Sequence, residues 1–490
     1  SEMCIRDRCI IIYQAGGSAC LVMKGLCILM KITKNLSGLS KNEIRSTYFS
    51  NMKPILNDRA MFADATEEYR SPEEPSAGDT VKLKFRTAKY NVDRVEVVVN
   101  GIAYSMKKFM TNTNFDYYIA EFTLGAQRTE YYFHALVGRT SIYYNQAGPY
   151  RELNPTYNFV INPGFKTPDW AKGAVIYQIY VDRFHNGDKS NDVVDNEYVY
   201  IGEPVHRITD WNEYPATMDV RNFYGGDLQG VLDKMDYLES LGIDAIYFNP
   251  LFVSPSNHKY DIQDYDYIDP HFGVIVNDGG EPLPDNARSN DNATKYKKRV
   301  TDYANLEASN EFFAKLVEEA HRRNIKVIID GVFNHCGSFN KWLDRERIYE
   351  GSEGFDKGAY VDKESPYHDF FKFQDDYAWP YNQSYLGWWG HDTLPKLNYE
   401  GSKKLEDYIL GIAKKWVSPP YNVDGWRLDV AADLGFSQEY NHIFWRKFRN
   451  AVKEANPEAI ILAENYGDSY SWLQGDQWDT IMTVSYTHLR

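Results

Sequence analysis

From Trp170 onward the chain repeats one pattern, in which a short apolar run is followed by a longer amphipathic run. The apolar runs include "GAVIYQIYV", "IDAIYFNP", "KVIIDGVFNH", "VDGWRLDVA" and "AIILAENY". The amphipathic runs between them include "LQGVLDKMDYLESLG", "NEFFAKLVEEAHRRN", "SKKLEDYILGIAKKWV" and "EYNHIFWRKFRNAVKEA". Apolar runs of strand length that alternate with helical patterns are typical of βαβ units, so we predict an α/β fold with a parallel sheet.

Polar residues follow nearly every predicted strand at its carboxyl end. In a (β/α)8 barrel that end of the sheet builds the active site, and we therefore predict a TIM barrel over residues 170–484. An aromatic, turn-rich stretch, residues 336–398, is predicted to be an inserted domain. The final run "WDTIMT" corresponds to the sixth strand, so we expect the barrel to be incomplete. The polar strand-end residues are Asp182, Arg183, Asn249, Asn334, His335, Arg427, Asp429 and Glu464.

Residues 52–163 carry a different pattern, made of short alternating runs separated by turn-forming residues. The runs are "VKLKFRT", "RVEVVVNG", "DYYIAEFTL", "TEYYFHALVG" and "TSIYYNQAG". Strand-length runs at this spacing predict a β-sandwich of immunoglobulin-like type. The stretch "NPGFKTPDW" follows as a linker.

The two ends of the chain do not fit either pattern. Residues 9–30 are apolar enough to suggest a signal peptide or membrane anchor, but Gln14, Gly16, Gly17 and Lys24 interrupt them. The opening "SEMCIRDR" and the closing "VSYTHLR" resemble translated sequencing-adapter read-through. We therefore interpret residues 1–51 as an artefact or a disordered leader, and residues 485–490 as an artefact. A genuine anchor is the alternative.

The net charge limits which classes of partner the protein is expected to bind, and the cysteine content indicates its cellular compartment. The net charge is -15, and no block of lysine or arginine offers a phosphate-binding face. Nucleic acid and anionic membranes are therefore not expected as partners. Four of the 5 cysteines lie within the first 27 residues, which leaves Cys336 alone in the body. A body with one cysteine holds no internal disulfide, and we expect a cytoplasmic protein.

Arg427 and Asp429 lie in the apolar run "VDGWRLDVA", where unpaired charges would be costly to bury. Residues i and i+2 share one face of a strand, so the guanidinium is expected beside the carboxylate and keeps it ionised. Glu464 ends the next strand and should face the same pocket. A retaining glycosidase needs two carboxyl groups about 5–5.5 Å apart. From this strand alone, a structural Arg–Asp pair that links the strand to its neighbour is as good an interpretation as a catalytic one.

With several motifs in order, the chain from residue 174 to residue 483 resembles the α-amylase superfamily of glycoside hydrolases. The resemblance is to its neopullulanase, cyclomaltodextrinase and maltogenic amylase branch. The motifs are "DGVFNH" (330–335), "GWRLDVAAD" (425–433), "AEN" with Glu464, "LPKLN" (394–398) and the loop "SNHKYDIQDY". The sandwich looks like the starch-binding-type module of that branch.

The resemblance implies roles for individual residues. It makes Asp429 the nucleophile and Glu464 the acid/base, with Asp330 supporting the site. It places Arg427 and His335 in contact with the sugar at the cleavage point, Tyr260 stacked on its ring and His258 nearby. The alternatives are a helix-cap or core histidine at His335 and a core ring at Tyr260.

The function implied is retaining hydrolysis of α-1,4-glucosidic bonds in maltooligosaccharides, cyclodextrins or pullulan, with an α-glucan as the partner molecule. A transglycosylase of the same family and a non-catalytic sugar-binding barrel are the alternatives. The family's fourth signature, a His-Asp pair after strand seven, is absent from this sequence, so we expect the chain itself to be inactive. A homodimer through the amino-terminal module is a further expectation.

The loop "NGDKSND" and the stretch "YGGD" together offer carboxylate, amide and carbonyl oxygens. Such oxygens suit calcium, which takes six to eight oxygen ligands. The same loop forms the calcium site of the enzymes that the chain resembles, and an ordinary solvated loop is the alternative. The expected ligands are Asn186, Asp188, Asn191, Asp192, Gly225 and Asp227.

Overall fold

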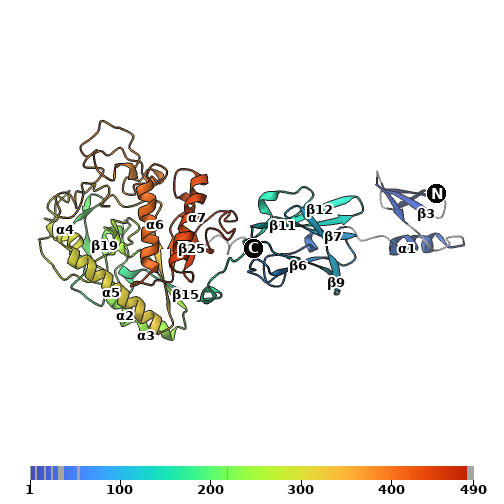
Figure 1. Ribbon diagram of the computed structural model, residues 1–490, viewed down its shortest axis with the longest axis horizontal. Coiled ribbons are helices and arrows are strands. Elements are labelled where there is room, and N and C mark those ends of the chain that lie inside the picture. The colour runs from blue at the N-terminus through green and yellow to red at the C-terminus, as the bar shows by residue number, and fades with distance from the viewer. Residues whose placement is uncertain are drawn as a thin grey trace. The chain divides into compact units, whose positions relative to one another are not determined.

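The computed structural model describes residues 2–5, 8–15, 18–23, 26–30, 38–51, 56–217 and 219–482. The chain divides into two compact units, Ser1–Gly164 and Phe165–Arg490 (Figure 1). The predicted artefact at residues 485–490, and parts of the predicted leader at 1–51, lie outside the described residues.

In the described part of the first unit, neighbouring strands pair antiparallel. One sheet joins β1 (Glu2–Ile5), β2 (Arg8–Ala15), β3 (Ser18–Met23) and β4 (Leu26–Met30), and the helix α1 (Lys41–Asn51) follows. The sandwich has two further sheets, in the orders β5-β6-β10-β9 and β13-β12-β11-β7-β8, with β14 paired to β11. Their bounds are β5 Arg70–Ser71, β6 Thr80–Ala88, β7 Arg94–Val99, β8 Ile102–Ser105, β9 Lys107–Thr111, β10 Phe115–Thr123, β11 Thr129–Val137, β12 Thr140–Asn145, β13 Gly148–Tyr150 and β14 Phe159–Ile161.

Alternation along the sandwich strands builds its core. In β6 the residues Val81, Leu83 and Phe85 are fully buried, while their neighbours on the other face are not. The Phe85 ring stacks on Phe133 with 4.7 Å between centroids. Each of the five predicted runs is a strand, and the immunoglobulin-like sandwich is confirmed. Strand β9 was not predicted, because all of its residues are exposed and its sequence does not alternate.

The second unit is built on six parallel strands in sequence order: β15 (Ile176–Ile179), β20 (Ala245–Phe248), β23 (Lys326–Gly331), β24 (Gly425–Leu428), β25 (Ile460–Glu464) and β26 (Thr480–Met482). Its helices are α2 (Leu228–Asp233), α3 (Met235–Ser240), α4 (Thr294–Thr301), α5 (Tyr303–Arg322), α6 (Lys403–Val417) and α7 (Gln438–Ala455). Figure 1 shows α6 and α7 side by side, and the two helices pack together. Strands that follow in order, with helices in each connection from β15 to β25, form part of a (β/α)8 barrel, as predicted.

The run predicted as one helix at "LQGVLDKMDYLESLG" is instead two helices, α2 and α3. They meet at Lys234, whose φ is -103° and ψ 7°. The Lys234 amide donates a hydrogen bond of 3.1 Å to the Val231 carbonyl, three residues back. This bond tightens the turn and interrupts the α-helical pattern of hydrogen bonds to the fourth residue back.

Between the barrel strands lie short elements with little regular structure. The strands are β16 (Val199–Tyr200), β17 (Glu203–Pro204), β18 (His206–Arg207), β19 (Asn222–Phe223), β21 (Phe252–Val253) and β22 (Asp264–Ile268). The short 3-10 helices of the chain are η1 Asp58–Ala60, η2 Pro155–Tyr157, η3 Asp169–Ala171, η4 Val181–Arg183, η5 Asp219–Arg221, η6 His368–Phe370, η7 Trp388–Gly390 and η8 Ala431–Asp433. Within the predicted insertion, residues 336–398, regular structure is limited to η6, η7 and isolated bridges.

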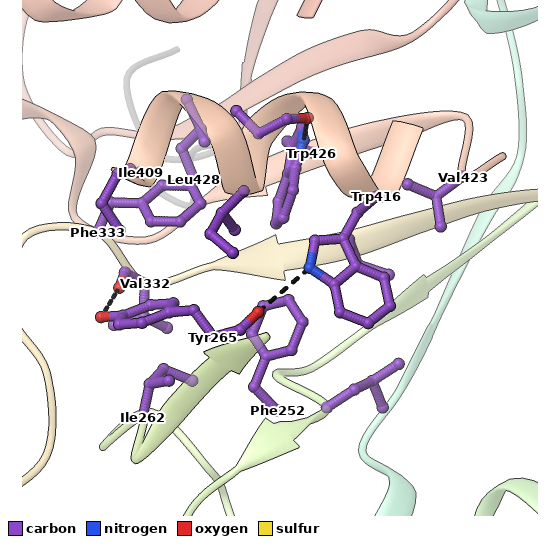
Figure 2. Close-up of a cluster of buried hydrophobic side chains, with 14 of the residues drawn as sticks. Phe252, Ile262, Tyr265, Val332, Phe333, Ile409, Trp416, Val423, Trp426 and Leu428 are labelled. Carbon is purple, nitrogen blue, oxygen red and sulfur yellow. Dashed lines mark hydrogen bonds between the residues drawn. The ribbon is translucent and has the colours of Figure 1, made fainter. Parts of the chain in front are cut away.

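The barrel core explains which way β24 faces. Trp426 and Leu428 are fully buried in a cluster with Trp416 of α6 (Figure 2). The Trp416 Nε1 donates to the Tyr265 carbonyl at 3.2 Å, and the Trp426 Nε1 donates to the Ala413 carbonyl at 3.1 Å, so both indoles keep a partner. Because side chains alternate along a strand, Arg427 points to the opposite face, toward the inside of the barrel.

None of the helices among the described residues is both long and apolar enough to cross a membrane.

Candidate active site

Arg427 is the centre of the candidate site. In the sheet it lies between Asp330 of β23 and Leu462 of β25. Its Nη1 donates to Asp429 Oδ1 at 2.9 Å and to Asp330 Oδ2 at 3.0 Å, and its Nη2 lies 2.8 Å from Glu464 Oε2. The side chain is only 5% exposed. One buried guanidinium therefore bridges three carboxyl groups that come from three consecutive strands.

Asp429 and Glu464 are linked beyond their common arginine. Asp429 follows directly after β24 and is 8% exposed, and Glu464 is the last residue of β25. Glu464 Oε2 also accepts a hydrogen bond of 3.0 Å from the Val430 amide, next to Asp429. Two strand ends thus place two carboxyl groups around one point at the carboxyl end of the sheet.

The electrostatics of the two carboxyl groups differ. Burial and the nearby Asp330 raise the pKa of Asp429 well above its ordinary value, and Arg427 opposes them. Burial would also raise the pKa of Glu464, but Arg427 and the Tyr466 hydroxyl hold it below its ordinary value. Three carboxyl groups share one cation, so their proton equilibria are coupled, and the raised pKa of Asp429 runs against the expectation that Arg427 alone keeps this carboxylate ionised.

Asp330 supports this cluster. It is fully buried, and its Oδ2 accepts hydrogen bonds from the Tyr260 hydroxyl at 3.1 Å, from the Tyr247 hydroxyl and from Arg427. Burial raises its pKa, against the effect of Arg427. An oxygen with three donors holds its neighbours in place and is poorly placed to attack a substrate.

Tyr260 and His258 lie on the loop between β21 and β22. The Tyr260 ring lies under the Arg427 guanidinium, 5.9 Å from its carbon, and its hydroxyl accepts from Asn249 Nδ2 at 3.3 Å. His258 Nδ1 accepts from the Tyr260 amide at 3.1 Å, and the two rings are 5.8 Å apart. Burial lowers the pKa of His258, which keeps the imidazole neutral.

His335 follows β23 and is 1% exposed. Its Nε2 donates to the Tyr260 carbonyl at 3.2 Å, and its Nδ1 accepts from Asn334 Nδ2 at 3.1 Å. Burial lowers its pKa to about 3, so the ring is neutral. Both nitrogens contact protein groups in this structure, and contact of His335 with a sugar stays a prediction.

Several residues near the cluster were missed by sequence reasoning. The Trp388 ring of the insertion stacks on His335 at 4.9 Å with 6° between planes. The Lys396 Nζ donates to Asn334 Oδ1 at 2.7 Å, and burial lowers its pKa to about 8. The Tyr466 hydroxyl donates to Glu464 Oε1. Two of these residues could have been found from the sequence, because they lie in or beside the recognised motifs. Lys396 lies inside "LPKLN", and Tyr466 closely follows "AEN".

The predicted metal loop is compact, and some of its buried side-chain oxygens have no hydrogen-bond partner among the described residues. Asn186 Nδ2 donates to Asp192 Oδ1 at 2.7 Å. The Oδ1 atoms of Asn186 and Asn191 are buried without a hydrogen-bond partner among the described residues. Gly225 has a φ of 79°, and a Cβ there would collide with Asp192 Oδ1, so only glycine fits against this loop.

The acidic residues of the loop are largely occupied. Asp227 accepts from the Gly187 amide at 3.0 Å, the Asp188 amide at 2.8 Å and the Gly230 amide at 2.6 Å, which makes it the N-cap of α2. Asp188 Oδ1 accepts from Ser190, and Asp192 Oδ2 pairs with Arg207. Among the described residues no group of three His, Cys, Asp or Glu side chains is arranged to hold a metal ion. Among the described side chains of this loop, buried oxygens with neither a hydrogen bond nor an ion pair remain on Asn186 and Asn191.

A parallel barrel sheet that gathers carboxyl groups around an arginine at its carboxyl end has the architecture of a barrel glycosidase. The family model for the alpha amylase catalytic domain matches residues 178–291 and 287–490. The model for the alpha amylase N-terminal ig-like domain matches residues 71–162. The chain belongs to the alpha-amylase family.

Individual relatives agree with this. The chain is 36% identical over 444 residues to a cyclomaltodextrinase of Thermoanaerobacter pseudethanolicus, covering 84% of this chain and 63% of the relative. It is 33% identical over 447 residues to neopullulanase 2 of Thermoactinomyces vulgaris, covering 86% and 63%. A solved cyclomaltodextrinase structure matches with a TM-score of 0.54 at 30% identity, covering 86% of this chain and 63% of that one. The chain thus spans under two thirds of these proteins.

Proposed function

We propose that this protein is a glycoside hydrolase that cleaves α-1,4-glucosidic bonds in maltooligosaccharides, cyclodextrins or pullulan with retention of configuration. The observation that carries the proposal is the bridge from Arg427 to Asp429 at 2.9 Å and to Glu464 at 2.8 Å, at the ends of adjacent strands. The names of the relatives, cyclomaltodextrinase and neopullulanase, support this substrate class.

In the first step, the Asp429 carboxylate forms a bond to the anomeric carbon while the bond to the leaving sugar oxygen breaks. Glu464 gives its proton to that oxygen. In the second step, Glu464 removes a proton from water, the water oxygen bonds to the anomeric carbon, and the ester to Asp429 breaks. Hydrolysis thus requires an ionised Asp429 and a protonated Glu464 when the substrate is bound.

The other residues position these groups. Arg427 holds one oxygen of Asp429 and one of Glu464, which fixes both carboxyl groups relative to each other. Tyr260 lies beside them with its ring fixed by Asp330, so we infer that it offers the stacking face for the sugar. Groups held in advance by packing and hydrogen bonds need no reorganisation during the reaction.

The direct test is Asp429→Asn in the gene product that contains all eight barrel strands, assayed on a maltooligosaccharide. Loss of the nucleophile should reduce kcat by about three orders of magnitude or more and leave sugar affinity within about threefold. The matched control is Asp407→Asn on the surface of α6, which should keep full activity. Full activity of the Asp429→Asn variant would show that the nucleophile is assigned wrongly.

We also propose that the 186–192 loop binds calcium through the side-chain oxygens of Asn186, Asn191 and Asp192 together with the Gly225 carbonyl. The buried amide oxygens without hydrogen bonds support this. The ion would hold the loop together and takes part in no chemical step. We also propose a cytoplasmic location, which rests on the cysteine pattern: after residue 27 the sequence contains one cysteine, Cys336, and its thiol is buried and free. The homodimer stays a prediction.

A further inference from the structure

A buried chain of alternating charges lies outside the carboxylate cluster. Lys259 Nζ lies 2.7 Å from Asp269 Oδ2, and Asp269 Oδ1 lies 2.8 Å from His271 Nδ1. His271 Nε2 lies 2.8 Å from Glu197 Oε1, and Glu197 Oε2 lies 2.8 Å from Arg299 Nη1. Arg299 also pairs with Asp278 at 2.9 Å. Lysine, aspartate, histidine and glutamate in this chain are each at most 6% exposed.

The first member, Lys259, lies between His258 and Tyr260 on the loop that connects β21 to β22. Asp269 and Ser254 lie at the base of this loop, and the Ser254 amide donates to Asp269 Oδ2 at 3.1 Å. The Lys259 ammonium reaches back to this base, where it donates to the Ser254 carbonyl at 3.0 Å and to Asp269. It also lies over the Phe272 ring at 4.6 Å. Lys259 thus links the tip of the loop to its base through an ion pair and a hydrogen bond.

The loop needs this ion pair to stabilise it, because the backbone at its tip has an unfavourable conformation. The φ of Lys259 is 60°, in the left-handed region that non-glycine residues rarely occupy. The backbone turns there so that the side chain points into the protein while Tyr260, the next residue, points to the Arg427 cluster. Such a conformation persists only where the surroundings hold it.

His271 holds the base of the loop from the other side. Both of its nitrogens lie 2.8 Å from a carboxylate oxygen, so both carry protons and the ring is an imidazolium. Burial would lower its pKa, but Glu197 and Asp269 raise it above its ordinary value. The charged groups around it are Asp269, Glu197, Lys259 and Arg299, and the Tyr296 ring stacks on it at 6.0 Å.

We propose that the Lys259–Asp269 ion pair, braced by His271, is a positioning device that sets the place of Tyr260 for the sugar at the cleavage point. The inference rests on the proposed function, and these residues act through Tyr260 without touching the substrate. A buried ion pair is not a strong source of stability, since an apolar pair of similar volume is often as good. What it adds here is a fixed geometry for the loop.

The test is a double-mutant cycle of Lys259→Met and Tyr260→Ala in the gene product with all eight barrel strands, with KM and kcat measured on a maltooligosaccharide. Lys259→Met should raise KM and lower kcat/KM about tenfold or more, as loss of an oriented binding contact does. In the Tyr260→Ala background the same change should alter kcat/KM less than about twofold, because the ring it positions is gone. Lys259→Arg should recover part of the loss.

The matched control is Lys341→Met, which removes another lysine that is paired with buried or partly buried carboxylates, Asp264 and Asp266, at 2.7 and 2.8 Å. It should lower Tm and leave KM unchanged. If Lys259→Met does not fold, Lys259→Met with Asp269→Asn removes both charges of the pair and takes its place in the cycle.

Equal losses from Lys259→Met in both backgrounds, or no loss in either, would overturn the positioning role. Unchanged activity of Tyr260→Ala would overturn it as well. These outcomes differ from failure of the proposed function, which would appear as full activity of Asp429→Asn in the same assay.

Discussion

The carboxyl groups of Asp429 and Glu464 share one guanidinium, at 2.9 Å from Nη1 and 2.8 Å from Nη2 of Arg427. Asp330 is a third carboxyl group on the same cation, at 3.0 Å. The apolar strand "VDGWRLDVA" can therefore hold an arginine and an aspartate, because neither is buried without a partner. The pairing ties three strand ends into one site.

Removal of the shared cation should destabilise the protein strongly. Arg427→Met leaves three carboxyl groups together without a counter-charge, and breaking a buried pair from one side costs about 3–5 kcal/mol. Urea unfolding checks this. The control is Arg446→Met, which removes an exposed pair with Asp476, worth about 0–1 kcal/mol. Equal, small losses in both variants would contradict the central place of Arg427.

Stability should fall at alkaline pH through His271. Its pKa is higher in the folded protein than its ordinary value, because Glu197 and Asp269 outweigh the effect of burial. The imidazolium therefore contributes its full stabilisation below pH ~6.5 and loses it as the pH rises through the folded pKa. The unfolding free energy of the protein minus that of His271→Gln, measured as a function of pH, should decline over that window. A difference independent of pH would contradict this.

Tyr466 should tune the acid/base. Its hydroxyl donates to Glu464 Oε1 and helps hold the pKa of Glu464 below its ordinary value. Tyr466→Phe removes that bond, so the pKa of Glu464 should rise. The acid is then protonated to higher pH, and the alkaline limb of the kcat/KM profile should move upward. The control, Tyr377→Phe, changes a ring that is 95% exposed and should leave the profile as it is.

Calcium should stabilise the native protein if the 186–192 loop binds it. A ligand bound only by the folded state raises stability by about 2.7 kcal/mol at a hundredfold excess over its Kd. A chelator should therefore lower Tm by about 2–4 °C for each kcal/mol lost. Asn186→Ala should abolish the response to the chelator and the heat of calcium binding in calorimetry. An unchanged Tm on chelation of calcium-loaded protein would favour a merely solvated loop.

The fold was largely predictable because its signals are local. The barrel strands are short apolar runs and most of the helices between them are amphipathic, and both patterns can be seen in a window of the sequence. Helix α4, "TKYKKRVT", was missed because four of its residues are basic and its apolar side is small. The break at Lys234 was missed because the apolar pattern continues through it.

The site was predictable only along single strands. The positions i and i+2 place Arg427 and Asp429 on one face, and Glu464 ends the next strand. Contacts between distant segments carry no such signal. The stacking of Trp388 on His335 and the bond from Tyr247 to Asp330 join different elements. The ion chain from Lys259 to Arg299 likewise depends on how loops fold back on each other.

The most direct test of the account is to trap the covalent intermediate on Asp429. A fluorinated α-glucosyl fluoride forms a glycosyl-enzyme faster than water can hydrolyse it, and the labelled protein can be digested and mapped by mass spectrometry. One added sugar is expected on the peptide that contains residues 425–433, located at Asp429 and absent from the Asp429→Asn variant. A sugar attached to Glu464 or Asp330, or hydrolysis with inverted configuration and no covalent adduct, would contradict it.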